Sequence, residues 1–282
     1  MRLFNRWREA EDMSKIDGAD PLVLYGTAFP SRLLLGTARY PSPKVLESAV
    51  RAAEPAMLTV SLRRQAAGHN EIGGQAFWDL LADLKVPFLP NTAGCHSLDE
   101  VFTTAMMARE VFGTDWIKLE LIGDDYTLQP DTLGLVSAAD KLLREGFKVL
   151  PYCTEDLVVC RRLIDVGCEA IMPWAAPIGT GKGPTNPFAL RLLRERIQVP
   201  ILIDAGIGVP SHACQVMEWG CDGVLLNTAV AQARDPVVLA GAFRAAISAG
   251  RAAFLGGAMA ERKSAEASTP VVGTPFWHLE GG

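Results

Sequence analysis

The sequence predicts an α/β fold, a (β/α)8 or TIM barrel with parallel strands, for three reasons. From Arg32 onward, β-rich runs alternate with amphipathic helical stretches, the pattern of repeated βα units around a parallel sheet. Eight such units fit the chain length of 282 residues. Glycine follows several helical stretches directly, as at Gly146, Gly167 and Gly220, where it ends a helix just before the next strand.

Each element is predicted from the spacing of its apolar residues. In chain order the predicted strands are Leu33–Gly36, Met57–Leu62, Phe88–Pro90, Trp116–Leu121, Lys148–Tyr152, Glu169–Pro173, Ile201–Asp204 and Gly223–Asn227. The predicted helices between them are Pro43–Ala53, Gln75–Leu84, Leu98–Phe112, Thr132–Glu145, Asp156–Val166, Pro187–Arg196, Ser211–Trp219 and Pro236–Ala249.

Ahead of the first barrel strand, Leu22–Tyr25 and Ser31–Leu35 flank a turn at Gly26. We predict that they form a short N-terminal hairpin that plugs the N-terminal mouth of the barrel. The catalytic domain is predicted to span residues 21–262 without an internal boundary. Residues 1–20 are expected to be an N-terminal extension and residues 263–282 a C-terminal tail, both peripheral or mobile.

An open, doubly wound sheet of the Rossmann type is the alternative fold. It calls for a G-x-G-x-x-G turn directly after the first strand. Here that strand ends in Gly36-Thr37-Ala38-Arg39, so the barrel is favoured.

The composition is that of an ordinary globular protein, with 27 basic and 32 acidic residues and a formal charge of -5. This balance argues against a nucleic-acid partner, which would normally require a basic stripe. No apolar run approaches the roughly 20 residues that cross a bilayer, and the first residues resemble neither a secretory signal nor a transit peptide. We therefore expect a cytoplasmic protein with no membrane partner.

The cysteines and histidines do not predict a metal site. None of the six cysteines forms a C-x-x-C pair, so reduced, mostly buried thiols are expected; they are Cys95, Cys153, Cys160, Cys168, Cys214 and Cys221. The histidines stand apart from one another, at His69, His96, His212 and His278, which is unlike a zinc site. His96 is expected to cap a helix or face solvent. No cofactor is expected.

Lys118 and Glu120 are the most informative pair in the chain. The two-residue period of the strand Trp116–Leu121 places both side chains on one face. That face cannot be an ordinary apolar core, because each buried charge costs roughly several kcal/mol unless it is paired. A buried lysine can respond by losing its proton and become an amine nucleophile. The alternative is an edge strand with both groups in water.

Polar residues also follow the other predicted strands, where a (β/α)8 barrel has its active site. They are Arg63 and Arg64, Asn91 and Thr92, Tyr152 to Asp156, and Asp204. Glycine-rich loops follow the last three strands, at Ile178–Gly183, Asp204–Gly208 and Leu226–Ala229. The third of these segments is expected to begin the last helix. A single glycine indicates only a turn. Three such loops together predict a phosphate cradle, because glycine lets backbone N–H groups approach an anion closely.

A phosphate cradle that faces an inward lysine predicts an enzyme acting on a phosphorylated sugar. The sugar's carbonyl would condense with Lys118 to form an imine, which acidifies the neighbouring C–H and C–OH positions. Glu120 and Asp204 could then act as acid and base. For Asp204 alone, a helix cap or a partner for a backbone turn is the alternative.

Several segments together resemble the bacterial thiazole synthase (ThiG) family of thiamin biosynthesis over roughly Leu22 to Ala267. They are Ser31–Thr37, Pro90–Cys95, Ile117–Glu120, Met172–Pro173, Pro177–Gly181, Asn186–Pro187, Ile203–Gly208 and Asn227–Val230. The resemblance implies a barrel that acts as a sulfur-transferring transferase and forms thiazole phosphate. Its substrates would be 1-deoxy-D-xylulose 5-phosphate, dehydroglycine (2-iminoacetate) and the C-terminal thiocarboxylate of the sulfur carrier protein ThiS.

The resemblance also assigns roles to residues. Lys118 matches the family's Schiff-base lysine, and Glu120 and Asp204 match its acid/base carboxylates. The positions that hold the sugar phosphate are matched by Gly179, Ala205, Gly206, Asn227 and Thr228. The family further implies a cytoplasmic homo-oligomer, typically a homotetramer, that contacts ThiS and a dehydroglycine-producing enzyme of the ThiH or ThiO type.

Two other functions remain open at this point. One is a different Schiff-base enzyme, aldolase-like and acting on another ketose phosphate. The other is a non-catalytic barrel that docks a sulfur carrier or senses a sugar phosphate.

Overall fold

The computed structural model describes residues 20–62 and 71–265. Its strands are β1 Leu22–Leu24, β2 Thr27–Phe29, β3 Leu33–Gly36, β4 Met57–Ser61, β5 Phe88–Asn91, β6 Trp116–Leu119, β7 Ile122–Asp124, β8 Gln129–Pro130, β9 Lys148–Cys153, β10 Met172–Pro173, β11 Leu202–Asp204 and β12 Gly223–Leu226. Its helices are α2 Pro43–Ala53, α4 Glu71–Asp83, α5 Leu98–Phe112, α6 Thr132–Arg144, α7 Leu157–Asp165, α8 Pro187–Arg196, α9 Pro210–Glu218, α10 Thr228–Ala231 and α11 Pro236–Gly256. Apart from their inner ends, the predicted extension 1–20 and tail 263–282 lie outside the described residues.

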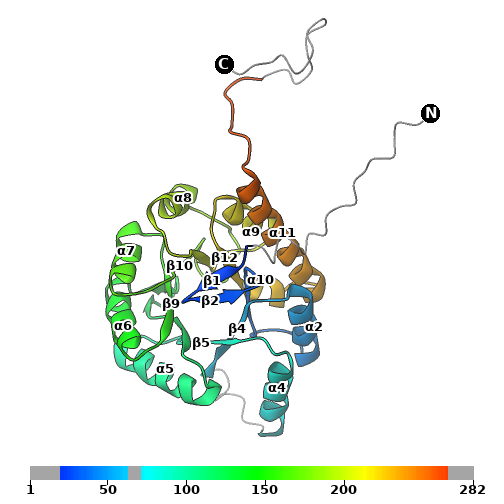
Figure 1. Ribbon diagram of the computed structural model, residues 1–282. Coiled ribbons are helices and arrows are strands. Elements are labelled where there is room, and N and C mark those ends of the chain that lie inside the picture. Colours follow the sequence, from blue (N-terminus) through cyan, green and yellow to red (C-terminus); the bar gives the residue numbers. More distant parts are fainter. Residues whose placement is uncertain (1–19, 63–70, 266–282) are drawn as a thin grey trace, which may run out of the picture.

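The predicted parallel barrel is confirmed. The eight-stranded sheet has the order β10-β9-β6-β5-β4-β3-β12-β11. Parallel bridges between Ile171 and Ile201, and between Trp174 and Asp204, join its two end strands and close the ring. The helices surround the strands (Figure 1), so the carboxyl ends of all eight strands meet at one mouth.

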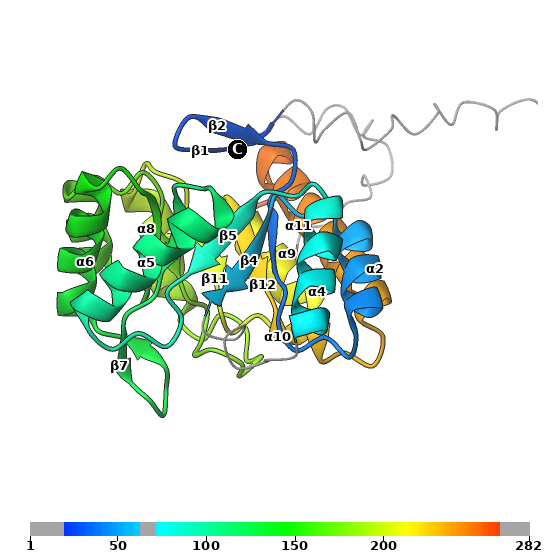
Figure 2. The same ribbon diagram turned by 90° about the horizontal axis from the view of Figure 1, so that it is seen from below.

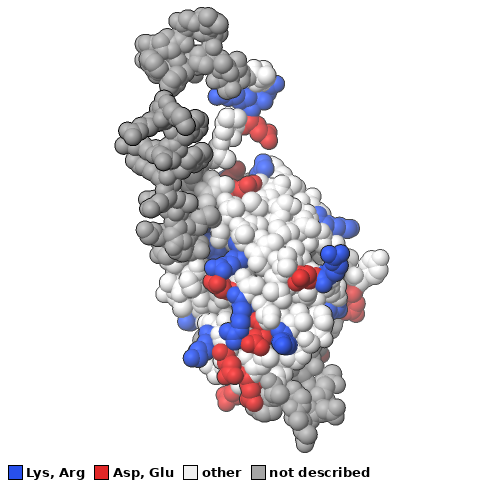
Figure 3. All heavy atoms as spheres, turned by 90° about the vertical axis from the view of Figure 1, so that its right-hand side faces the viewer, with Lys and Arg blue, Asp and Glu red and all other residues white. Residues whose placement is uncertain are grey.

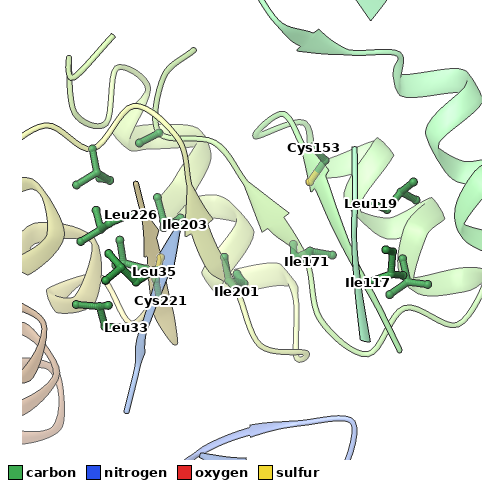
Figure 4. Close-up of a cluster of buried hydrophobic side chains, with 14 of the residues drawn as sticks. Leu33, Leu35, Ile117, Leu119, Cys153, Ile171, Ile201, Ile203, Cys221 and Leu226 are labelled. Atoms are coloured by element: carbon green, nitrogen blue, oxygen red, sulfur yellow. The ribbon is translucent and has the colours of Figure 1, made fainter. Parts of the chain in front are cut away.

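Apolar side chains on alternate strand positions build two core layers. One layer faces the helices and includes Leu33, Leu35, Ile117 and Leu119, which point outward from β3 and β6 (Figure 4). The other fills the barrel near its N-terminal end and consists of Leu34, Met57, Leu89, Leu150, Met172, Leu202 and Leu225 together with residues of the hairpin. The lower part of the barrel is therefore packed, and open space is left for the C-terminal mouth.

The N-terminal hairpin closes the opposite end, as expected (Figures 1 and 2). Its second strand is β2, however, and not the predicted Ser31–Leu35. Tyr25 and Gly26 both have positive φ, 45° and 70°, which makes a two-residue turn of the kind that joins tight hairpins. The chain therefore reverses at once, and Leu24 pairs with Thr27. The Tyr25 hydroxyl donates to the carbonyl of Val149, at 2.8 Å, and fastens the hairpin to β9.

Two local elements were not predicted. The small hairpin β7–β8 projects from the C-terminal mouth (Figure 2), and its turn is held because Asp124 accepts hydrogen bonds from the N–H and hydroxyl of Thr127. The short helix α10 is separate from α11, so the loop after β12 does not open the last helix as expected. Asp235 caps α11 by accepting from the N–H groups of Val237 and Val238.

Helix α11 has 21 residues and continues past the predicted end at Ala249. It is the one helix within the described residues that is long and apolar enough to cross a membrane by length and composition. In the structure it packs beside α9, where a Cβ on Gly250 would lie 2.4 Å from the carbonyl oxygen of Cys214. On the face that carries α2 and α11, acidic and basic side chains intermingle (Figure 3), as in the pairs Arg51–Glu47 and Arg244–Glu54.

Candidate active site

The structure brings Lys118, Glu120 and Asp204 together inside the barrel mouth. The Lys118 ammonium lies 3.1 Å from Oε1 of Glu120 and 2.6 Å from Oδ2 of Asp204. Only 6%, 6% and 3% of the three residues are exposed. The edge-strand alternative is therefore wrong, and so is the helix-cap alternative for Asp204.

Backbone contacts fix each member of this triad. Asp204 ends β11, next to the bridge that closes the barrel. Strand β6 ends at Leu119, so Glu120 lies just beyond it, against the expectation that the strand continues to Leu121. The buried hydroxyl of Thr92 replaces the missing strand pairing: it donates to the carbonyl of Glu120 and accepts from the N–H of the same residue, both at 2.7 Å.

Charge and burial compete within the triad. Burial alone would lower the pKa of Lys118, but the attraction of Asp204 and Glu120 outweighs it, so the pKa lies above its ordinary value. The idea that burial deprotonates this lysine is therefore wrong for the free protein. Burial raises the pKa of Asp204 despite the adjacent ammonium, and Glu120 adds to the rise. Asp204 is thus the carboxylate best suited to accept the lysine's proton.

A cavity of about 970 Å³ opens above the triad, and Lys118, Glu120 and Asp204 line it. This is near the upper end of the volumes typical of small-molecule sites, about 300–1,000 Å³. All five positions that the resemblance assigns to sugar phosphate also line it, namely Gly179, Ala205, Gly206, Asn227 and Thr228. The predicted site residues therefore surround one cavity.

The loop after β11 is held in an unusual conformation. Ala205 and Gly206 have φ angles of 65° and 76°, a left-handed geometry that is uncommon for alanine. A Cβ on Gly206 would lie 2.4 Å from the nitrogen of Ala176, so the loops after β10 and β11 approach too closely for a side chain. The carbonyl of Gly206 accepts from the N–H of Gly183 at 2.8 Å, which keeps the two loops together.

Asn227 follows β12, the strand next to β11, and lies against the end of β3. A Cβ on Gly36 would lie 2.6 Å from the Cβ of Asn227, so glycine is needed there. The side-chain oxygen Oδ1 of Asn227 is buried and has no hydrogen-bond partner in the described structure. A buried polar atom of this kind normally has a partner, which fits a position that contacts a ligand.

Tyr152 was predicted only as one of several polar residues after strand five. It is fully buried, and its ring lies beside the triad with the Lys118 ammonium 5.7 Å from its centroid. Its hydroxyl donates to the carbonyl of Leu128 in the β7–β8 hairpin at 3.3 Å. Trp174 meets the ring edge-on, with centroids 6.4 Å apart. The tyrosine thus connects the triad to the projecting hairpin.

The other predicted polar residues have different outcomes, and Asn91 lines the cavity and pairs with Lys118. Arg63 and Arg64 fall outside the described residues. The half-exposed Glu155 accepts a hydrogen bond from the indole of Trp174, and His96 lies at the surface, 3.5 Å from Asp125. Sequence reasoning missed Arg39, Thr59 and Ser61, all of which line the cavity.

None of the six cysteines forms a disulfide bond. Within residues 20–62 and 71–265, no group of three or more His, Cys, Asp or Glu side chains is placed to hold a metal ion.

The fold and the site define a (β/α)8 barrel with a buried amine between two carboxylates, an arrangement suited to enzymes that activate carbonyl compounds through lysine. The sequence profile described as "Thiazole biosynthesis protein ThiG" matches residues 23–270. The chain therefore belongs to the ThiG family.

Its curated relatives match almost end to end. The thiazole synthase of Variovorax paradoxus is 71% identical over 266 residues, covering 94% of this chain and 97% of that protein. The thiazole synthase of Ralstonia nicotianae is 72% identical over 263 residues, covering 93% and 95%.

Solved structures agree in fold. The Amycolatopsis orientalis BexX/CysO complex contains a chain with a TM-score of 0.77 and 29% identity, covering 87% of this chain and 100% of that one. A native KDPGal structure matches with a TM-score of 0.54 and 17% identity, covering 82% and 100%, which supports the fold alone.

Proposed function

We propose that this protein is a thiazole synthase that forms an imine between Lys118 and the ketone of 1-deoxy-D-xylulose 5-phosphate. One observation carries the proposal: Lys118 is buried at the base of a large cavity, within 3.1 Å of Glu120 and 2.6 Å of Asp204. A structural ion pair would not need a second carboxylate or an open cavity above it. Family membership supplies the thiazole product.

Imine formation requires the amine to lose its proton first. Asp204 is the nearest proton acceptor, and its raised pKa favours the protonated carboxyl group. The free amine then adds to the carbonyl carbon. Asp204 returns its proton to the hydroxyl of the resulting carbinolamine, which leaves as water and gives the iminium ion. That ion carries the same positive charge as the original ammonium, so the two carboxylates stabilise it in place.

The iminium draws electrons from the adjacent carbon and makes its proton acidic. Glu120 and Asp204 are the groups placed to remove and return protons there. Incorporation of dehydroglycine and of sulfur from the ThiS thiocarboxylate would complete the ring. The cavity is roomy enough for the sugar and the end of an extended chain to share, which supports delivery of sulfur by a protein tail.

The sugar's phosphate would lie in the cradle formed by Gly179, Ala205, Gly206, Asn227 and Thr228. The positive φ angles at Gly179, 77°, and at Ala205 and Gly206 shape these loops. Backbone N–H groups in such turns form concave anion sites. The cradle and the lysine line the same cavity, so one five-carbon substrate could reach both.

The proposed partners are ThiS and a dehydroglycine-producing enzyme of the ThiH or ThiO type. The protein is proposed to be a cytoplasmic homo-oligomer, specifically a homotetramer. The similarity of this chain to BexX, which was solved in a complex with CysO, supports a protein partner. Size measurement by light scattering tests the oligomer, and a tetramer is the expected result.

Reductive trapping tests the central proposal. The protein is incubated with 1-deoxy-D-xylulose 5-phosphate and cyanoborohydride, and the modified peptide is mapped by mass spectrometry. We expect one reduced sugar adduct on Lys118. The control is Lys118→Arg, which keeps a positive charge between the carboxylates but cannot form an imine, because its guanidinium stays charged. Adduct formation only with another ketose phosphate would instead favour the aldolase-like reading.

Reconstitution tests the full reaction. Wild-type protein, thiocarboxylated ThiS, the deoxy sugar phosphate and glyoxylate with ammonia should yield thiazole phosphate. Trapping without thiazole formation would restrict the function to imine chemistry. Binding of the carrier without trapping would favour the non-catalytic alternative.

A further inference from the structure

The charges around the cavity do not suit an anionic substrate unless one more residue takes part. Within the described part of the chain, the charged residues that line the cavity are Arg39, Lys118, Glu120 and Asp204. The triad contains one ammonium and two carboxylates, so its net charge is -1 when all are ionised. A sugar phosphate carries close to two negative charges at neutral pH. The triad alone would therefore repel it, and among the described lining residues Arg39 is the remaining cation.

Arg39 is also free to bind. Its guanidinium has no hydrogen-bond or ion-pair partner among the described residues, whereas Arg32, Arg194 and Arg251 each pair with a carboxylate. It is exposed at the cavity wall. An unpaired arginine on a wall that also carries two buried carboxylates is a group available to an incoming anion.

The position of Arg39 places it on the cradle side of the cavity. It lies in the loop after β3, and β3 pairs with β12 so that Leu35 is opposite Leu226. The residues that follow both strands therefore lie side by side, with Gly36 packed against Asn227. Arg39 has φ of 70°, a conformation that is uncommon outside glycine, asparagine and aspartate. The loop holds Arg39 in a backbone conformation that costs free energy, and such strained residues often cluster at functional sites.

We infer that Arg39 binds the phosphate of the sugar and thereby selects phosphorylated over unphosphorylated substrates. The planar guanidinium can donate two parallel hydrogen bonds to phosphate oxygens, while the glycine loops of the cradle contribute backbone N–H groups. The inference rests on the proposed function, which supplies the phosphorylated sugar.

The test compares two sugars that differ only in the phosphate. Cyanoborohydride trapping is measured against concentration with 1-deoxy-D-xylulose 5-phosphate and with 1-deoxy-D-xylulose, for wild type, Arg39→Gln, Arg39→Lys and the surface control Arg51→Gln. In Arg39→Gln we expect the half-saturating concentration of the phosphorylated sugar to rise about 10–100-fold, because the phosphate loses a charged hydrogen-bonding partner. The unphosphorylated sugar and the maximal trapping rate should be unchanged, and Arg39→Lys should recover part of the loss.

Equal weakening of both sugars in Arg39→Gln, or no change for the phosphorylated one, would overturn the inference. If wild type trapped neither sugar, the proposed imine chemistry would fail. Arg39 would still be tested by calorimetry with inorganic phosphate, where wild type should bind and Arg39→Gln should bind at least tenfold more weakly. Absence of that difference would reject the role of Arg39 on its own.

Discussion

Replacing Asp204 with asparagine should move imine formation to lower pH. The carboxylate oxygen is 2.6 Å from the lysine nitrogen and both groups are buried. An opposite charge favours the protonated amine, so removing it lowers the pKa of Lys118. Because only the neutral amine attacks a carbonyl, the pH at which trapping reaches half its maximum must fall with it.

The size of the shift follows from the geometry. At an effective dielectric of 20, two unit charges 2.6 Å apart attract by about 6 kcal/mol. Removing one partner of a buried ion pair costs roughly 3–5 kcal/mol in practice. Asparagine still offers a polar oxygen and Glu120 remains, so we take the lower figure. It corresponds to a downward shift of about 2 pH units.

The assay is the initial rate of adduct formation on Lys118, measured by mass spectrometry with cyanoborohydride between about pH 7 and about pH 12, because the raised pKa of Lys118 puts the wild-type midpoint above the ordinary lysine value of about 10.4. Asp222→Asn is the matched control, since it removes a carboxylate that pairs with Arg194 before β12, at the opposite end of the barrel. Its profile should coincide with wild type. A midpoint for Asp204→Asn that stays put or moves upward would refute the electrostatic argument.

The remaining predictions concern stability and position. Lys118→Ala should destabilise the fold by about 3–5 kcal/mol near neutral pH. Without the ammonium, the pKa of Asp204 is higher in the folded than in the unfolded chain, so urea unfolding should show less stability at about pH 8 than at about pH 5.5; equal stability would contradict this. Gly206→Ala should lose trapping and lower the melting temperature more than Gly179→Ala, because a Cβ clashes with backbone only at Gly206. Tyr152→Leu should lower the trapping midpoint by about 0.5–1 pH unit through the lost ring–ammonium contact, while Tyr152→Phe should not; equal shifts would assign the effect to the hydroxyl.

The site was predictable where it depends on period and on strand ends. A two-residue strand period put Lys118 and Glu120 on one face, and the rule that barrel strands end at one mouth brought Asp204 to them. The structure adds the hydroxyl of Thr92, which orients Glu120 beyond the end of β6. That contact joins residues 28 positions apart, so no local sequence pattern predicts it.

Other features escaped because short motifs carry several meanings. Tyr25-Gly26 indicates a turn, but only two consecutive positive φ angles decide that the hairpin closes at Thr27. Arg39 follows a strand like many surface arginines, and its significance appears only when the charges lining the cavity are counted. In both cases the deciding quantity is three-dimensional.

The two carboxylates also explain how one site can hold a cation before and after the reaction. In the proposed reaction, the ammonium of Lys118 and the later iminium carry the same charge in nearly the same place, so the triad would stabilise both. The neutral amine between them is the unfavourable stage, because its proton must remain nearby. Asp204, with its raised pKa and a contact of 2.6 Å, can hold that proton without releasing it to solvent. In the proposed step this proton returns to the departing hydroxyl, so Asp204 is a carboxylate again when the iminium forms, and Glu120 lies 3.1 Å from the same nitrogen as a second carboxylate.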